Sequence, residues 1–269
     1  MITSGLRRRG FRVAGESGRV SSYRHAVERI DSSDFACGVV LHSAPGFPAF
    51  PVRLATEIFL RARARLPGDG PVTLWDPCCG SGYLLTVLGL LHRRSLRQVI
   101  ASDVDPAPLE LAAKNLALLS PAGLTARELE RRRQSERFAK PSYLEAAHAA
   151  RRLRDRLSAD GEALPFTMRV ADVFDPRSLS AVVAGSAPDV VLTDLPYGER
   201  THWEGTVPGQ PVAGMLRSLA SVLPAHAVIA VTDRSRRIPV APVRALERLK
   251  IGTRSAVLVR AADVLDAGS

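Results

Sequence analysis

The chain has 269 residues, with 37 Lys or Arg against 27 Asp or Glu, which gives a formal net charge of +10 and a pI of about 10.5. An apolar fraction of 46% argues against wholesale disorder, and three cysteines are too few for a disulfide-stapled secreted domain. The charge indicates a polyanionic partner, with nucleic acid first and an anionic membrane surface as the alternative.

The chain begins with a basic segment. Residues 1–29 carry seven arginines against two glutamates, a net charge of +5. Arg7, Arg8 and Arg9 lead into a polar stretch instead of the apolar segment of a signal peptide, and the longest apolar run, residues 83–91, is too short to span a bilayer. We therefore expect a cytoplasmic protein without a membrane partner, with residues 1–21 as a disordered basic tail and residues 22–269 as a single domain.

The predicted elements then follow one another in a regular order. An amphipathic helix over residues 51–65 lies within an N-terminal helical extension, residues 22–70, and from residue 72 short β-branched runs alternate with helical patterns. The pattern predicts five strands at residues 72–75, 98–102, 166–171, 189–193 and 227–232, helices at 84–93, 108–119, 178–184 and 212–223, and a closing strand pair at 248–253 and 256–261. This is an α/β fold with a seven-stranded, mostly parallel sheet covered by helices on both faces. The closing pair favours the Rossmann-like fold of class I methyltransferases over that of a dehydrogenase.

One stretch interrupts this alternation. Residues 120–164 hold two helical patterns, 126–138 and 142–157, which we interpret as an inserted helical hairpin. Residues 127–156 carry nine arginines and one lysine against five acidic residues, again a net of +5, so the hairpin and the N-terminal segment account for the whole excess. A helix in which acidic and basic residues are interleaved often has no role beyond exposing its charges to solvent. We favour a surface that follows an RNA backbone, with Arg131, Arg132 and Arg133 as contacts, because guanidinium groups pair with phosphates and stack on unpaired bases.

A glycine-containing loop, Asp76-Pro77-Cys78-Cys79-Gly80-Ser81-Gly82, follows the first strand and opens a helix. Gly80 and Gly82 permit a tight turn and a close backbone approach to a ligand. Leu85 stands where the dinucleotide fingerprint needs a third glycine, and the loop instead resembles the first motif of S-adenosylmethionine-dependent methyltransferases. In that motif the acidic residue and the glycines hold the amino acid part of the cofactor.

Further acidic residues end the next strands. Asp103 is placed to accept the ribose hydroxyls of a nucleoside, while Asp105 is interpreted as a helix cap. Asp172, after the third strand, resembles the residue that binds the adenine amino group in this fold, although a capping role is the alternative. We predict that S-adenosylmethionine is held by Asp76, Cys78, Gly80, Gly82, Asp103, Asp172 and Asp194.

The sharpest motif, Asp194-Leu195-Pro196-Tyr197, ends the fourth strand. It resembles the Asp/Asn-Pro-Pro-Tyr/Phe motif of methyltransferases that act on exocyclic amino groups of bases, with Leu195 in place of the first proline. Acceptors in the plane of the base help to localise a nitrogen lone pair toward the sulfonium methyl, so Asp194 and the Leu195 carbonyl are the expected acceptors. Pro196 stiffens the turn, and Tyr197 offers a ring for the base to stack on.

The loop after this motif carries candidate RNA contacts. Trp203 could stack on a flipped base and Arg200 could contact a phosphate, although a lid packed on its own Trp is equally open. A basic group that includes Arg236 follows the fifth strand and faces the same rim. Cys78 and Cys79 lie in the cofactor loop, badly placed for the cysteine nucleophile of pyrimidine C5 methylation, and His202 has no metal partner. We expect no metal and no obligate protein partner.

With these motifs in order, the chain resembles the avilamycin-resistance rRNA methyltransferases of the AviRa type over residues 22–269. The resemblance is carried by residues 22–30, 75–82, 194–203 and 231–235. It implies monomethylation of a guanine in 23S rRNA of the large ribosomal subunit, with resistance to orthosomycin antibiotics such as avilamycin. By analogy with amino methyltransferases we expect N2 of guanine as the methylated atom, with N1 open.

Two other functions remain open from the sequence. A DNA adenine-N6 or cytosine-N4 methyltransferase would use the same tetrapeptide at residues 194–197, but a target-recognition domain of the usual size is lacking. A non-catalytic RNA-binding protein would explain the charge alone. Methyl transfer from labelled S-adenosylmethionine to rRNA or to DNA separates these functions.

Overall fold

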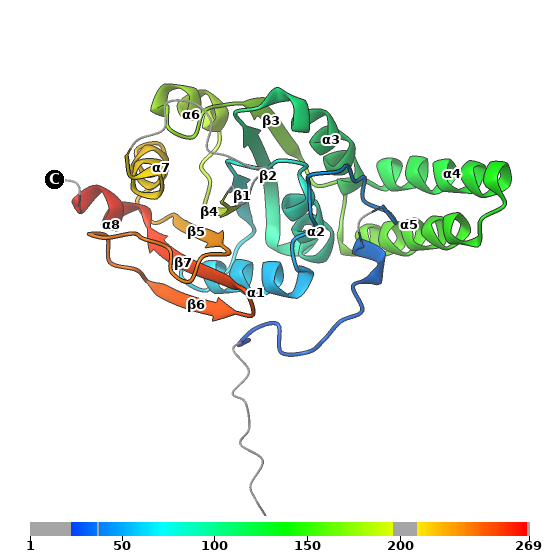
Figure 1. Cartoon of the computed structure of the whole chain (residues 1–269), viewed down its shortest axis with the longest axis horizontal. Coiled ribbons are helices and arrows are strands. Elements are labelled where there is room, and N and C mark those ends of the chain that lie inside the picture. Colours follow the sequence, from blue (N-terminus) through cyan, green and yellow to red (C-terminus); the bar gives the residue numbers. More distant parts are fainter. Residues whose placement is uncertain (1–22, 37, 196–208, 268–269) are drawn as a thin grey trace, which may run out of the picture.

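The computed structural model describes residues 23–36, 38–195 and 209–267, and these form one layered α/β unit (Figure 1). Its centre is a seven-stranded sheet with strand order β3-β2-β1-β4-β5-β7-β6. The strands are β1 (Val72–Asp76), β2 (Leu96–Asp103), β3 (Phe166–Val170), β4 (Val190–Asp194), β5 (Val228–Asp233), β6 (Glu247–Ile251) and β7 (Arg254–Arg260). The first five are mutually parallel, and β7 runs antiparallel to both β5 and β6. The fold class predicted from the sequence is confirmed.

Alternate strand residues face two separate apolar cores, because side chains point to opposite faces of a sheet with a period of two. Leu74 and Val99 belong to one core, whereas their neighbours Trp75 and Ile100 belong to the other. The first core is covered by α1 (Val52–Arg63), α2 (Tyr83–Leu91) and α3 (Pro106–Leu116), and the second by α6 (Pro176–Val183), α7 (Pro211–Ala220) and α8 (Ala261–Asp266). The short helix α8 was not predicted.

Several helix starts are fixed by the side chains that the sequence places there. Asp105 accepts the N–H of Ala107 at 2.9 Å and caps α3, as predicted. Asp175 caps α6 in the same way, and Ser120 caps α4 (Pro121–Phe138) by accepting the N–H of Gly123. In each case a proline follows the cap, where its missing N–H costs nothing.

The inserted hairpin consists of α4 (Pro121–Phe138) and α5 (Pro141–Asp160), which project from the sheet beside α3 (Figure 1). At the turn Ala139 adopts the left-handed conformation, with φ of 52°, and ends α4. Buried Leu124, Leu153 and Leu157 join the first core, so the base of the hairpin is part of the domain. None of the helices in the described part of the chain is long and apolar enough to cross a membrane.

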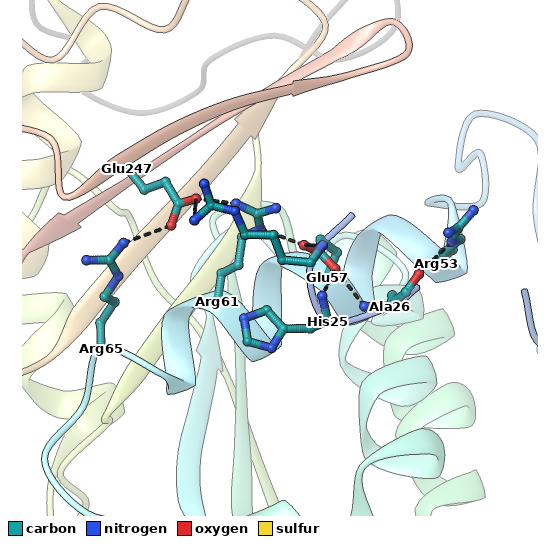
Figure 2. A network of polar contacts seen from close by, with 8 residues as sticks. His25, Ala26, Arg53, Glu57, Arg61, Arg65 and Glu247 are labelled. Carbon is teal, nitrogen blue, oxygen red and sulfur yellow. Dashed lines mark hydrogen bonds and ion pairs between the residues drawn. The ribbon is translucent and has the colours of Figure 1, made fainter. Parts of the chain in front are cut away.

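The segment before α1 is mostly irregular, in contrast to the predicted helical extension. It holds one short 3-10 helix, η1 (Ser33–Phe35), and is fastened to α1 by the fully buried Glu57 (Figure 2). The Glu57 carboxylate accepts backbone N–H groups of Arg24, His25 and Ala26 at 2.6, 2.9 and 2.7 Å. Burial opposes ionisation, but these donors and Arg61 outweigh it and lower the pKa of Glu57 to about 2.

The same network continues to the far edge of the sheet. The Arg61 Nε donates to Glu57 at 2.6 Å, and its Nη1 pairs with Glu247 at the start of β6. Arg65 also pairs with Glu247, at 3.1 Å (Figure 2). The N-terminal segment, α1 and the last hairpin are therefore linked through a single chain of charged groups.

Candidate active site

Three carboxylates end three neighbouring strands. Asp76 ends β1, Asp103 ends β2 and Asp194 ends β4, and β2-β1-β4 are consecutive in the sheet. Because parallel strands end at the same edge, the three side chains share one rim, where ligands bind in open α/β sheets. The structure therefore places the acidic residues predicted from the sequence to bind the cofactor at one rim. Asp172, which follows β3, lies at the same rim.

The loop after β1 is folded around these carboxylates. Asp76 accepts the N–H of Cys78 at 3.2 Å, and Asp103 accepts the N–H of Gly80 at 2.8 Å. Gly80 and Gly82 have φ of +49° and +69°, the left-handed region that glycine adopts without strain. A Cβ at Gly82 would lie 3.2 Å from Ala112 in α3. Both positions thus favour glycine by their backbone conformation, and at Gly82 the close approach of α3 also leaves little room for a side chain.

The rim is electrostatically unfavourable without a cation. Burial raises the pKa of Asp76 to about 7, and the charges of Asp103 and Asp194 add to this effect. Burial also raises the pKa of Asp103, although the N–H groups of Gly80 and Asp105 oppose it. A positively charged ligand at this rim would relieve the repulsion between the carboxylates. The carboxylates therefore suit a cationic ligand, and as hydrogen-bond acceptors they can also bind hydroxyl groups on that ligand.

Asp194 has two strong donors on one oxygen. Its Oδ1 accepts from Thr232 Oγ1 and from Arg254 Nη1, each at 2.5 Å. Burial raises the pKa of Asp194, while the hydrogen bond from Thr232 and the charge of Arg254 oppose that rise. Leu195 is buried and donates its N–H to the carbonyl of Thr232 at 2.8 Å, so its backbone continues the sheet pairing.

Thr232, Arg254 and the aromatic Phe50 were not predicted as site residues. The Arg254 guanidinium lies 4.5 Å from the centre of the Phe50 ring, just before α1. The place of Arg254 at the site depends on the sheet topology. Because β7 is antiparallel to β5, the first residue of β7 lies at the rim where β5 ends. The sequence signal is an arginine at the start of a mostly apolar strand, and in the structure the next five residues of that strand are buried.

The other members of the tetrapeptide and of the loop after it are outside the described residues. They are Pro196, Tyr197, Arg200 and Trp203, and their expected roles stay predictions. Cys79 is buried, Cys78 is partly buried, and burial raises the pKa of both thiols well above the usual range. Protonated thiols are poor nucleophiles, so neither cysteine is suited to the nucleophilic role in pyrimidine C5 methylation. Within residues 23–36, 38–195 and 209–267 there is no group of acidic, His and Cys side chains arranged for a metal.

The predicted RNA contacts on the hairpin fall into different environments. Arg131 is 8% exposed, and its guanidinium donates to the carbonyls of Val39 and Gly38 and to the side chain of Gln134. The expectation that Arg131 contacts RNA is therefore wrong for this structure, because its charged group is used to hold the segment before α1. Buried Arg127 acts similarly, donating to the carbonyl of Val40 at 2.7 Å.

The remaining candidates lie at the surface. Arg132 is paired with Glu128, which also accepts from Arg154 of α5 at 2.7 Å and so joins the two helices. Arg133 and Arg236 are exposed, Arg133 on α4 and Arg236 after β5. Arg137, one turn beyond Arg133, is exposed as well. An exposed basic face thus exists on α4, but it is centred on Arg133 and Arg137 rather than on Arg131.

Comparisons with known proteins give a consistent result. A model of the family described as "rRNA methyltransferase AviRa" matches residues 21–254. The 23S rRNA (guanine(2535)-N(1))-methyltransferase of Streptomyces viridochromogenes is 90% identical over 249 residues, which cover 93% of this chain and 100% of that protein. Two solved structures of the rRNA methyltransferase aviRa from the same organism match with a TM-score of 0.88 at 90% and 89% identity, over 93% of this chain and 100% of each structure. The resemblance noted in the sequence is confirmed: the chain belongs to the AviRa family of rRNA methyltransferases.

Proposed function

We propose that this protein transfers a methyl group from S-adenosylmethionine to N1 of a guanine base in 23S rRNA of the large ribosomal subunit. The relative that is 90% identical is named for this atom and this RNA. The structural observation that carries the proposal is the Asp194 carboxylate, an acceptor held beside the carboxylates at the ends of β1 and β2. The expectation of N2 is therefore replaced by N1.

The rim suits the cofactor through its own chemistry. Asp76 would hold the ammonium group of the amino acid part of the cofactor. That cation would offset the burial and the neighbouring carboxylates that raise the pKa of Asp76. Asp103 would accept the ribose hydroxyls, with Gly80 and Gly82 giving the backbone room to approach. Asp172, whose carboxylate also accepts the N–H of Phe174 at 2.8 Å, is proposed for the adenine end. When bound, the cofactor supplies a methyl group activated by the positive charge on sulfur.

The target base is recognised by hydrogen bonding at Asp194. Guanine carries a proton on N1 and two on N2, so its Watson–Crick edge presents donors to an ionised carboxylate. Adenine N1 carries a lone pair instead and would be repelled by the same group. An acceptor at this position therefore selects guanine, and it also receives the N1 proton that must leave before N1 acquires a methyl group.

The RNA is held outside the rim by basic side chains on the surface. We propose Arg132, Arg133 and Arg137 on α4 and Arg236 after β5 as contributors, together with the predicted contacts Arg200 and Trp203. The base must leave its stack to reach Asp194, so an unpaired or weakly paired nucleotide is the expected target. Methylation of the ribosome in the cytoplasm would then give resistance to orthosomycin antibiotics.

The test uses tritiated S-adenosylmethionine with 23S rRNA, assembled large subunits or DNA. Label in 23S rRNA, together with a reverse-transcription stop, supports N1 methylation, since a methyl group there blocks the Watson–Crick edge. Label without a stop would return N2 to consideration, and label in DNA alone would refute the proposal. A susceptibility test with avilamycin in a sensitive host expressing the protein checks the resistance.

A substitution at Asp194 checks the assignment of roles. Asp194→Ala should abolish methyl transfer while cofactor affinity, measured by calorimetry, stays within a few fold. Asp263→Ala on α8 is the matched control, because it removes a carboxylate on an element remote from the rim. Loss of cofactor binding in Asp194→Ala would move this residue from base recognition to cofactor binding.

A further inference from the structure

Asp194 is held by donors from two other strands. Oδ1 accepts from Thr232 on β5 and from Arg254 on β7, both at 2.5 Å. In the described part of the chain, no hydrogen bond reaches the second oxygen, Oδ2. Among the described residues the carboxylate therefore has partners on one oxygen only, although it ends a strand at the rim where the base is proposed to bind.

Arg254 is built into this place rather than lying on the surface. It is 5% exposed, and its guanidinium lies over the ring of Phe50, which is itself 5% exposed. The antiparallel pairing of Asp233 with Ser255 brings the start of β7 to the end of β5, beside Asp194. A guanidinium held between an aromatic ring and a carboxylate has little freedom to move.

We propose that Arg254 is a positioning residue for methyl transfer, which together with Thr232 fixes Asp194 through Oδ1 and leaves Oδ2 as the acceptor of the guanine N1–H. This inference rests on the proposed function and adds the group that orients the acceptor. It also assigns a role to an arginine outside the motif at residues 194–197.

The proposed arrangement accounts for the proton and for the electrons. The N1 proton passes to Oδ2, and N1 retains the electron pair of the broken N–H bond. That pair forms the new bond to the methyl carbon, while the pair of the carbon–sulfur bond remains on sulfur. Guanine is neutral before and after the transfer. The sulfonium loses its positive charge when it becomes a thioether, and this charge is balanced by the proton that passes from N1 to Asp194.

Arg254 also bears on which base is accepted. The carboxylate faces Asp233 on β5 and Asp76 on β1, both of which disfavour its charge, and Arg254 is the cation that opposes them. Without Arg254, protonated Asp194 would present an O–H donor and lose its preference for a base edge that donates. Selection of guanine and transfer of its proton therefore depend on the same ion pair.

A purely structural role for Arg254 would be to tie β7 to the segment before α1. The two roles differ in their pH dependence. Replacing Arg254 with Gln removes a positive charge next to Asp194, so the pKa of Asp194 rises and the acid limb of the kcat profile moves to higher pH. A nearby Arg lowers a carboxyl pKa by about 1–3 units, so a shift of about one unit is the expected minimum.

The experiment compares wild type, Arg254→Gln and Arg254→Lys, with Arg260→Gln at the opposite end of β7 as the control. For Arg254→Gln we expect kcat to fall about 100-fold or more, with KM for an rRNA fragment and cofactor affinity within a few fold. Arg254→Lys should recover part of kcat and the original pH limb. In an Asp194→Asn background, Arg254→Gln should cause little further loss.

The outcomes separate this inference from the function on which it rests. If wild type does not methylate 23S rRNA, the proposed function fails, and a carbon-13 NMR titration of Asp194 in wild type and Arg254→Gln still tests the ion pair. An unshifted pH limb and an unshifted titration would overturn the inference. So would equal losses of kcat and melting temperature in Arg254→Gln and Arg254→Lys, because that result describes only a structural tie.

Discussion

The basic face of α4 gives a quantitative prediction about RNA binding. Arg133 and Arg137 lie one helical turn apart and are exposed, and neither has an ion pair among the described residues. Replacing both with Gln removes two charges without disturbing the buried contacts of Arg127 and Arg131. If each contacts one phosphate, two fewer counterions are released when RNA binds.

The expected magnitude follows from counterion release. Each phosphate contact contributes about 0.7 to 0.9 to the slope of log K against log salt, so the double variant should have a slope shallower by about 1.4 to 1.8. Between 50 and 200 mM salt, wild type should then lose about tenfold more affinity than the variant. Fluorescence anisotropy with a labelled 23S rRNA fragment over this range measures the slope.

The matched control removes two other surface arginines. Arg97, at the start of β2, and Arg244, before β6, lie at the opposite edge of the sheet from the rim. Their double replacement with Gln changes the net charge by the same amount and should leave the slope close to that of wild type. If both double variants change the slope equally, the effect is one of overall charge, and the proposed RNA-binding face on α4 is refuted.

Two further predictions concern stability. Arg131→Ala should lower the free energy of unfolding by about 1–3 kcal/mol, because it leaves the carbonyls of Gly38 and Val39 without a donor, and it should not alter the salt slope; urea titration and anisotropy test this. Burial lowers the pKa of His92 to about 4, so the unfolded chain binds a proton below pH 6.5 that the folded protein binds only near pH 4. Stability should therefore fall as pH decreases from 6.5 to 4, by at most about 3 kcal/mol from this residue, and His92→Gln should flatten that part of a pH series of urea titrations.

The sequence was most informative where a structural property is local. Alternation of β-branched runs with helical patterns located all seven strands, and Asp105 and its following proline marked a helix start correctly. The gap between the helical patterns at residues 126–138 and 142–157 located the turn of the hairpin. Each of these features depends on neighbours within a few residues, which is the range over which periodicity and capping act.

What could not be predicted depends on pairing between distant residues. Arg131 lies in an arginine-rich helix and is of a residue type usually found at the surface. Its burial follows only from the packing of Gly38 and Val39 against α4. Arg254 lies 60 residues from Asp194, and its role depends on the register of β7 against β5. No pattern within α4 or β7 alone carries that information, because it arises from the topology of the sheet and from the path of the N-terminal segment.

The fastening of residues 24–26 to α1 has a consequence for how freely this part of the chain can vary. Glu57 contacts only backbone N–H groups there, so it holds the segment without regard to which side chains the segment carries. Almost any residue would satisfy it at these three positions, and proline alone would remove a donor. The Glu57 contacts therefore depend on one glutamate in the helix and not on the side chains of the segment, where only Arg24 adds an ion pair of its own, to Glu247 at 3.6 Å, among the described residues.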